Sequence, residues 1–187
     1  MPVSDALHLE TTPLEGLLLL TPRRFGDARG FFSESWNKAT MQAVGIDLEF
    51  VQDNHSLSER KGTLRGLHFQ TPPMAQAKLV RCGRGALFDV AVDIRRASPT
   101  FGQWFGVELS AENGRQLLVP VGFAHGFVTL QDDTEICYKC TAPYAPDCDA
   151  EIAWNDPVVG VDWGVSEPVL SDKDAQAGPL AKVGTPF

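Results

Sequence analysis

The clearest pattern along the chain is an alternation of apolar and polar residues in the segment ALFDVAVDIR, residues 86–95. Phe88, Val90, Val92 and Ile94 alternate there with Asp89, Ala91, Asp93 and Arg95. This period of two is the repeat of a β-strand, because successive side chains of a strand point to opposite faces. The segments RQLLVP, GFVTL and EICYKC continue the series, and Gly (17) and Pro (13) recur between the apolar runs. The pattern predicts an all-β protein, a β-sandwich or jelly roll.

Two short segments break the pattern and predict helices. One runs from about residue 38 to residue 44, with Asn37 as its N-cap and Gly45 beyond its end. The other starts at Ser171 and stops before Gly178-Pro179. The chain contains no repeat, low-complexity tract or linker that would divide it, so we expect one domain over residues 1–187.

Composition narrows the classes of function. The chain has 187 residues, 43% hydrophobic and 21% charged, with a net charge of −8. An acidic chain is a poor candidate for binding nucleic acid, and no apolar run is long enough to span a membrane. The N-terminus lacks the features of a signal peptide, and four cysteines then indicate reduced thiols in the cytoplasm.

Two of the four histidines lie in glycine-flanked strand segments, RGLHFQ and PVGFAHGF. PVGFAHGF, which contains His125, has the P-x-G-x-x-H pattern of the second cupin motif. The first cupin motif needs H-x-H, but this chain has His68-Phe69-Gln70. Because a metal site needs three or four protein ligands, we expect a cupin-like barrel or sandwich that holds no metal.

Three residues near these motifs indicate chemistry that needs no metal. A neutral histidine such as His68 can remove a proton beside a carbonyl, and the ammonium of Lys78 can stabilise the resulting enolate oxygen. The phenol of Tyr138 can return a proton from another direction. Together they predict epimerisation next to a ketone.

The sequence resembles the dTDP-4-dehydrorhamnose 3,5-epimerase family of deoxysugar biosynthesis over nearly its whole length. The matching stretches, in chain order, are FGDARGFFSESWN (25–37), FVQDNHS (50–56), LRGLHFQ (64–70), AKLVRC (77–82), FDVAVDIR (88–95), SPTFGQW (98–104), LSAEN (109–113), PVGFAHGFVTL (120–130), YKCT (138–141), WND (154–156) and LSDKDAQAGPL (170–180). LRGLHFQ and GFAHGFVTL are the most specific of these.

The resemblance implies a set of site residues. His68 would be the general base, Asp174 its dyad partner, Tyr138 the general acid and Lys78 the group that stabilises the enolate. Lys78 and His125 would line the sugar pocket. The remaining substrate contacts would be Arg29, Glu34, Gln52, Asn54, Arg65, Asp149 and Lys173. Asp149 stands where relatives often have a glutamate, and this shorter carboxylate weakens the expectation of a contact there.

The resemblance also implies a substrate and an assembly. The enzyme would convert dTDP-4-dehydro-6-deoxy-D-glucose to dTDP-4-dehydro-L-rhamnose, an intermediate for cell-surface polysaccharides, without metal, nicotinamide or flavin. It would be a homodimer, with N-terminal strands exchanged between subunits and residues 171–187 forming a C-terminal helical segment and tail. Three alternatives remain open: a mono-epimerase acting at C3 or C5 alone, a metal-dependent cupin enzyme, and a non-catalytic binder of nucleotide sugars.

Several residues have a simpler structural interpretation. Asp174 follows Ser171 by three positions, so SDKD also resembles a capping box, and on the residues alone capping is favoured. His68 and Tyr138 fit the interior of a sandwich equally well as core residues, and Arg29 fits a solvated turn. Cys137 and Cys140 form C-x-x-C, but no second such pair is present to complete a zinc site. We expect both cysteines to be packing residues.

Arg65 and His68 pose a geometric problem. Strict alternation along a strand places them on opposite faces, whereas the resemblance puts both at the substrate. Gly66 lies between them, and a glycine in a strand often marks a bulge that redirects a neighbouring side chain. We therefore expect a local irregularity at Gly66, with Arg65 at the phosphate end of the pocket.

Overall fold

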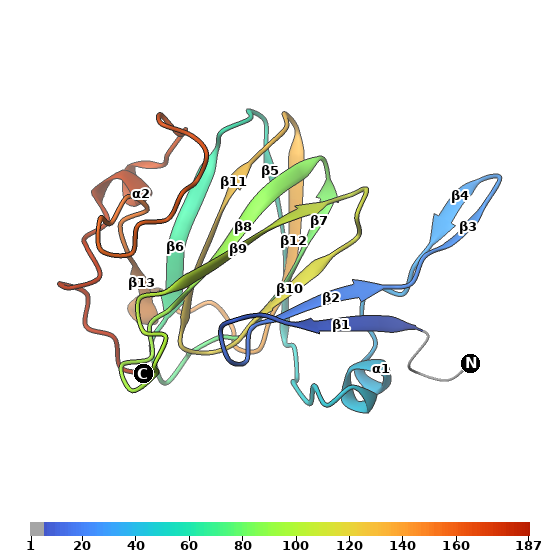
Figure 1. Ribbon diagram of the computed structural model, residues 1–187, viewed down its shortest axis with the longest axis horizontal. Helices are drawn as coiled ribbons and strands as arrows, with labels where there is room; N and C mark the ends of the chain where they lie inside the picture. Colours follow the sequence, from blue (N-terminus) through green and yellow to red (C-terminus); the bar gives the residue numbers. More distant parts are fainter. Residues whose placement is uncertain (1–5) are drawn as a thin grey trace.

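Two antiparallel sheets lie face to face in the computed structural model, which describes residues 6–187 (Figure 1). The six-stranded sheet has the order β1 (Leu7–Thr11), β2 (Leu18–Pro22), β10 (Gln116–Val119), β7 (Lys78–Arg84), β12 (Thr134–Cys140), β5 (Gln52–Ser58). The five-stranded sheet has the order β13 (Asp149–Glu151), β6 (Leu64–Gln70), β11 (Phe123–Thr129), β8 (Ala86–Asp93), β9 (Trp104–Ser110). The predicted β-sandwich is confirmed.

The alternation in β8 separates two apolar layers rather than core from solvent. Leu87 and Ala91 pack in the cluster between the two sheets. Val90 and Val92 pack in a second cluster on the other face, where residues 152–187 cover the five-stranded sheet. Both faces of β8 are therefore buried, and the polar residues of its inner face, Asp89 and Asp93, are fully buried with them. A buried carboxylate needs a partner: Asp93 accepts hydrogen bonds from Arg95, and Oδ1 of Asp89 lies 2.8 Å from Nε2 of His125.

The predicted helices form where the capping residues placed them. Helix α1 spans Lys38–Ala43, and the Asn37 side chain accepts hydrogen bonds from the backbone N–H groups of Ala39 and Thr40. Helix α2 spans Asp172–Gln176 and is capped by Ser171. A short 3-10 helix, η2, spans Pro146–Cys148. No helix in the described part of the chain is long and apolar enough to cross a membrane.

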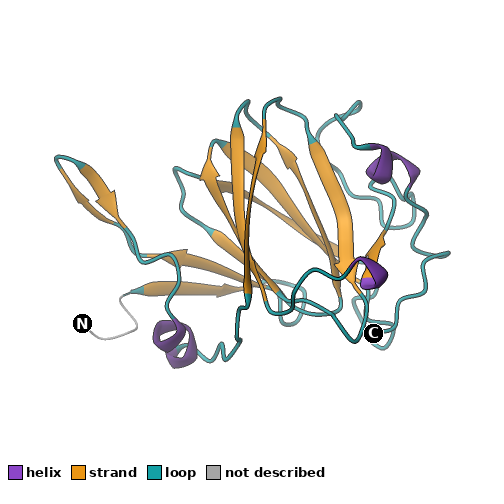
Figure 2. Cartoon of the chain, turned by 180° about the vertical axis from the view of Figure 1, so that it is seen from behind, coloured by secondary structure: helices purple, strands orange, loops and turns teal. Residues whose placement is uncertain are grey.

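A two-stranded hairpin stands apart from the sandwich. Strands β3 (Phe25–Asp27) and β4 (Gly30–Phe32) pair only with each other and extend away from the body, as Figures 1 and 2 both show. Phe31 and Phe32 on this hairpin are 60% and 69% exposed. Exposed aromatic residues on a projecting arm are typical of a surface that contacts another protein chain.

Candidate active site

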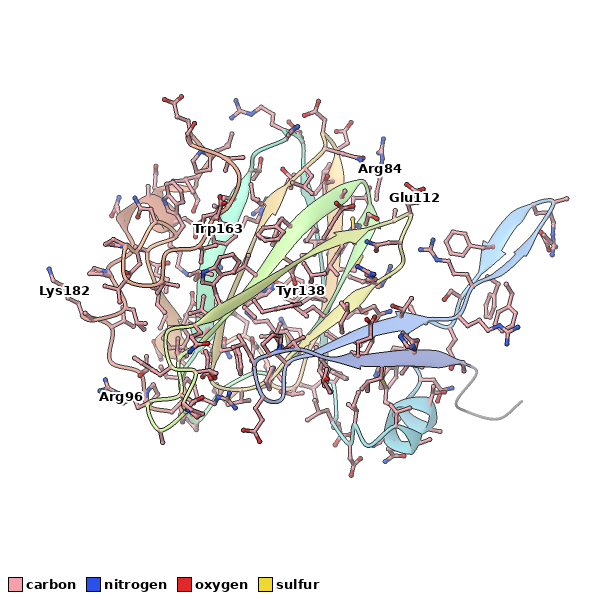
Figure 3. All side chains as sticks on the ribbon, viewed as in Figure 1. Arg84, Arg96, Glu112, Tyr138, Trp163 and Lys182 are labelled. Atoms are coloured by element: carbon pink, nitrogen blue, oxygen red, sulfur yellow. The ribbon has the colours of Figure 1, made fainter. Side chains whose placement is uncertain are left out.

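Two cavities of about 450 and 260 Å³ open between the sheets, and His68, Lys78 and Tyr138 line both of them. His68 comes from β6 in the five-stranded sheet, whereas Lys78 and Tyr138 come from β7 and β12 in the six-stranded sheet. Figure 3 shows Tyr138 inside the sandwich, while Arg84, Glu112 and Lys182 lie at its periphery. The two sheets thus present different reactive groups to one shared space.

His68 forms a dyad with Asp174. Nε2 of His68 lies 2.6 Å from Oδ1 of Asp174, whose carboxylate is 4% exposed. The Ser171 hydroxyl donates to Oδ2 of Asp174 at 2.7 Å, and the Gly66 N–H donates to Oδ1 at 3.3 Å. Burial by itself would raise the pKa of Asp174, but these hydrogen bonds, led by that from His68, outweigh it and hold the pKa below its ordinary value. Asp174 therefore stays charged beside the ring.

This geometry resolves the capping alternative for Asp174. Ser171 is the N-cap of α2, because its hydroxyl accepts the hydrogen bond from the backbone N–H of Asp174 at 3.1 Å. The carboxylate of Asp174 is then available to His68. The capping pattern in the sequence was real, but the capping side chain belongs to Ser171.

Burial shifts the two candidate groups on the opposite wall in opposite directions. It lowers the pKa of Lys78, because a charged ammonium loses its hydration inside the protein. It raises the pKa of Tyr138, because the phenolate is the charged form of that side chain. Lys78 is thus a readier proton donor than a surface lysine, and Tyr138 holds its proton more firmly than a surface tyrosine.

A second histidine–carboxylate pair lies beside the dyad. His125 stands opposite His68 in the pairing of β11 with β6 and lines the smaller cavity. Its Nε2 lies 2.8 Å from Oδ1 of Asp89, and both side chains are buried. The sequence analysis placed His125 in the pocket but missed Asp89. Asp89 alternates with apolar residues in the sequence just as a solvent-facing residue of a strand would, so the pattern gave no signal for it.

Gln70, which occupies the position of the second histidine in H-x-H, is fully engaged in holding loops. Its Nε2 donates to the backbone oxygens of Met74 at 2.6 Å and Pro143 at 3.1 Å. Its Oε1 accepts from the Ala145 N–H at 2.8 Å. Gln70 therefore holds the rim of the larger cavity, and its amide oxygen is used by the Ala145 N–H rather than by His68 or His125.

Polar side chains gather in the larger cavity. Gln52, Asn54, Asp149 and Lys173, four of the predicted substrate contacts, line it, and Lys173 donates to Asp149. The carboxylates of Asp149 and Glu151 raise the pKa of Lys173 despite its partial burial, so it remains a cation. Tyr144 also lines this cavity and was not predicted from the sequence. Its hydroxyl lies 3.2 Å from Asp149.

Cys140 is buried, as expected of a packing residue, and it also forms part of the wall of this cavity. The Asn54 amide lies 3.6 Å from its sulfur, and burial raises the pKa of the thiol. Cys137 is half-buried and, like Cys140, is a free cysteine.

Arg65 and His68 both reach the smaller cavity, despite their positions on one strand. The pairing of β11 with β6 shifts register between His125 and Phe127, opposite the segment that contains Gly66. Gly66 has φ +131°, and a Cβ there would lie 2.5 Å from the Cα of Gly126. The irregularity predicted at Gly66 is confirmed. Arg65 currently donates to Ser58 and to the Leu57 carbonyl.

Two predicted substrate contacts lie outside both cavities of their own chain. Arg29 is at the tip of the projecting hairpin, where its 89% exposed side chain pairs with Asp27. Glu34 accepts hydrogen bonds from Asn37 at 3.1 Å and Thr40 at 3.0 Å, beside the start of α1. Within one chain, neither residue reaches His68.

Comparison with known proteins gives a consistent result. A family model described as dTDP-4-dehydrorhamnose 3,5-epimerase matches residues 11–182. A protein of that description from Salmonella typhimurium is 56% identical over 168 residues, which cover 89% of this chain and 91% of the relative.

Two solved structures extend this similarity to the fold. The dTDP-4-dehydrorhamnose 3,5-epimerase of Bacillus anthracis, with TDP and PPi bound, has a TM-score of 0.91 at 50% identity and covers 93% of this chain and 99% of its own. The dTDP-6-deoxy-D-glucose-3,5-epimerase of Legionella pneumophila, in complex with dTDP-4-keto-L-rhamnose, has a TM-score of 0.90 at 47% identity and covers 95% of each chain.

Proposed function

The chain belongs to the dTDP-4-dehydrorhamnose 3,5-epimerase family and is an isomerase of that type, and we propose that His68, Lys78 and Tyr138 carry its proton transfers. The observation that supports these roles is the division of the cavity between the two sheets. The His68–Asp174 dyad lies on one wall, and Lys78 and Tyr138 lie on the other. Inversion of a carbon requires removal and return of a proton on opposite faces of the sugar ring, which two walls can provide.

The proposed reaction starts at the carbons next to the C4 ketone. Neutral His68 takes the proton from C5, and in a second round from C3, while Asp174 stabilises the imidazolium that forms. The electron pair left behind moves to the ketone oxygen, where the Lys78 ammonium donates to the developing enolate. Tyr138 then returns a proton to the carbon from the opposite face. Before the second round, the imidazolium loses its proton to water and the phenolate takes one from water, which restores both groups. No redox step occurs, so the chemistry requires neither nicotinamide nor flavin.

We assign the substrate to the dTDP-linked 4-keto-6-deoxyhexoses, with dTDP-4-dehydro-6-deoxy-D-glucose as the specific compound. The related structures that hold TDP and a dTDP-keto sugar support this class. His125, Lys78 and the dyad would surround the sugar. Arg65 and Lys173 would bind the diphosphate through charge-assisted hydrogen bonds, with Gln52, Asn54 and Asp149 nearby. Lys173 would have to turn from Asp149 toward the phosphates.

We further propose a homodimer in which the β3–β4 hairpin brings Arg29 and Glu34 to the partner's cavity. Two observations support this arrangement. The hairpin projects from the body with Phe31 and Phe32 exposed, and Arg29 and Glu34 lie outside the cavities of their own chain. A cytoplasmic location also remains a proposal, supported by the four free cysteines.

Solvent exchange separates the base from the acid. In heavy water, His68→Ala should abolish deuterium uptake at both C3 and C5. Uptake that persists in this variant would assign the base to another group, such as His125 with its partner Asp89. Tyr138→Phe removes only a hydroxyl. Exchange should continue in that variant on the His68 face, while inverted product falls by about 10²–10⁴-fold, the usual worth of a positioned general acid. Inversion by Tyr138→Phe at the wild-type rate would assign the acid to another group.

The same measurement tests the open alternatives. Uptake and inversion at both carbons are expected, whereas uptake at one carbon alone identifies a mono-epimerase. Activity should survive exhaustive treatment with EDTA. Loss of activity on chelation, restored by a divalent metal, would contradict the metal-free mechanism.

A further inference from the structure

Two sequence stretches, WND (154–156) and LSDKDAQAGPL (170–180), meet on the outer side of the five-stranded sheet. Both lie in the segment 152–187, which Figure 1 shows as loops around the short helix α2. The backbone N–H of Leu180 donates to Oδ2 of Asp156 at 2.6 Å, across 24 positions of the chain. The proposed reaction assigns no role to Asp156.

Asp156 uses both oxygens of its carboxylate to hold backbone groups. The residue is 3% exposed. Its Oδ1 accepts from the N–H of Val158 at 2.7 Å and from that of Val159 at 3.3 Å, while Oδ2 accepts from Leu180. Hydrogen bonds to a charged acceptor are roughly twice as strong as neutral ones. Asp156 therefore ties Leu180 firmly to the turn that follows WND.

This tie lies just beyond α2, the helix that carries Asp174. Helix α2 has 5 residues, too few to be stable on its own, so its position depends on how its two ends are attached. Before α2, the backbone of Val169 bridges to Thr63, next to the start of β6. After α2, only residues 177–179 precede Leu180 and its bond to Asp156.

We propose that Asp156 is a positioning residue that holds Asp174 against His68, an inference that rests on the proposed role of this dyad. Asp156 lines neither of the two cavities, so it acts only through the chain that joins it to α2. Nε2 of His68 lies 2.6 Å from Oδ1 of Asp174, and a displacement of α2 by about 1 Å would lengthen this contact beyond a hydrogen bond. Misplacement on that scale can slow an enzyme by about 10²-fold.

Asp156→Asn is the variant that tests this role. The asparagine oxygen can still accept from one side, but its amide group then faces the Leu180 N–H, and two donors cannot bond to each other. We expect kcat to fall by about 10–100-fold. Asp93→Asn is the matched control. Asp93 is also buried, and its carboxylate holds the loop 95–100, so this variant should lose stability while its folded fraction keeps kcat.

Two measurements separate positioning from a general loss of structure. In a double-mutant cycle, Asp156→Asn should lower kcat by less than about twofold in an Asp174→Ala background, because the group that it positions is already absent. By NMR, the ring N–H of His68 that is bonded to Asp174 should give a slowly exchanging signal, assigned by its absence in His68→Ala. This signal should persist in Asp93→Asn and disappear in Asp156→Asn.

Wild-type kcat or an unchanged ring signal in folded Asp156→Asn would overturn the proposal, as would equal losses of kcat with and without Asp174. If Asp156→Asn does not fold, Pro179→Gly takes its place. It loosens the chain between α2 and Leu180 and should change kcat and the ring signal in the same direction. Wild-type kcat in Asp174→Ala would contradict the proposed dyad instead, and the signal of His68 would then decide alone whether Asp156 positions Asp174.

Discussion

At the scale of single residues, burial determines which group limits the reaction at high pH. In the proposed mechanism, Lys78 must stay protonated to stabilise the enolate, and Tyr138 must stay protonated to return a proton. Burial lowers the pKa of Lys78 and raises the pKa of Tyr138. As pH rises, Lys78 therefore loses its proton first, even though the ordinary pKa values of the two side chains are close.

The alkaline decline of kcat should accordingly belong to Lys78. It should occur below the ordinary lysine pKa and persist in Tyr138→Phe. In Lys78→Arg it should move to higher pH, because a guanidinium keeps its charge throughout the accessible range. The check is kcat against pH for the three proteins. An alkaline decline that disappears in Tyr138→Phe would assign it to the phenol.

The sequence allowed the proposed reactive residues to be named more readily than their partners. His68, Lys78 and Tyr138 could be proposed from chemistry that needs only side-chain type. Asp89 could not be proposed in this way, because its position in the protein interior depends on both faces of β8 being buried. The alternation in ALFDVAVDIR is equally compatible with a strand that exposes one face to solvent. The pairing of Asp149 with Lys173 likewise depends on how residues 24 positions apart meet in space.

At the scale of elements, the close approach of β6 and β11 holds both histidines in place. Gly66 lies in β6 with φ +131°, and an added Cβ would lie 2.9 Å from the His125 carbonyl oxygen as well as 2.5 Å from Gly126. Backbone cannot move aside as a flexible side chain can. Any residue larger than glycine must separate the strands that carry His68 and His125.

Gly66→Ala should therefore damage both stability and catalysis. We expect a loss of about 2–4 kcal/mol in the free energy of unfolding, from the positive φ and the overpacked strands together. The properly folded fraction should show reduced kcat. The matched control is Gly83→Ala in β7, where an added Cβ meets nothing closer than the Cys137 sulfur at 3.4 Å and φ is unremarkable. Chemical denaturation and kcat measure the two effects, and equal stability of the two variants would contradict this role of Gly66.

At the scale of the whole molecule, the arrangement of layers was more predictable than the position of the hairpin. Period-two segments and turn residues predicted a sandwich, and the capping residues Asn37 and Ser171 predicted both helices. The stretch FGDARGFF contains no signal for where its hairpin will point. The direction of the hairpin depends on contacts with residues distant in the sequence. Arg29, at its tip, lies away from the cavity that the family resemblance assigns to it.

Mixed dimers test whether Arg29 completes the partner's site. His68→Ala lacks the proposed base, and Arg29→Ala should bind substrate poorly. Each homodimer should therefore have low activity at substrate concentrations below saturation. If the hairpin crosses, a mixed dimer contains one site with intact His68 from one chain and intact Arg29 from the other. Random mixing by joint refolding should then restore about a quarter of the wild-type sites, since half of the dimers are mixed and each carries one intact site. The converse mixture, wild type with the double variant, should lose activity, because each mixed dimer then has one defect in each site. If Arg29 instead serves its own chain, the first mixture recovers nothing, and each wild-type chain in the second keeps its full activity.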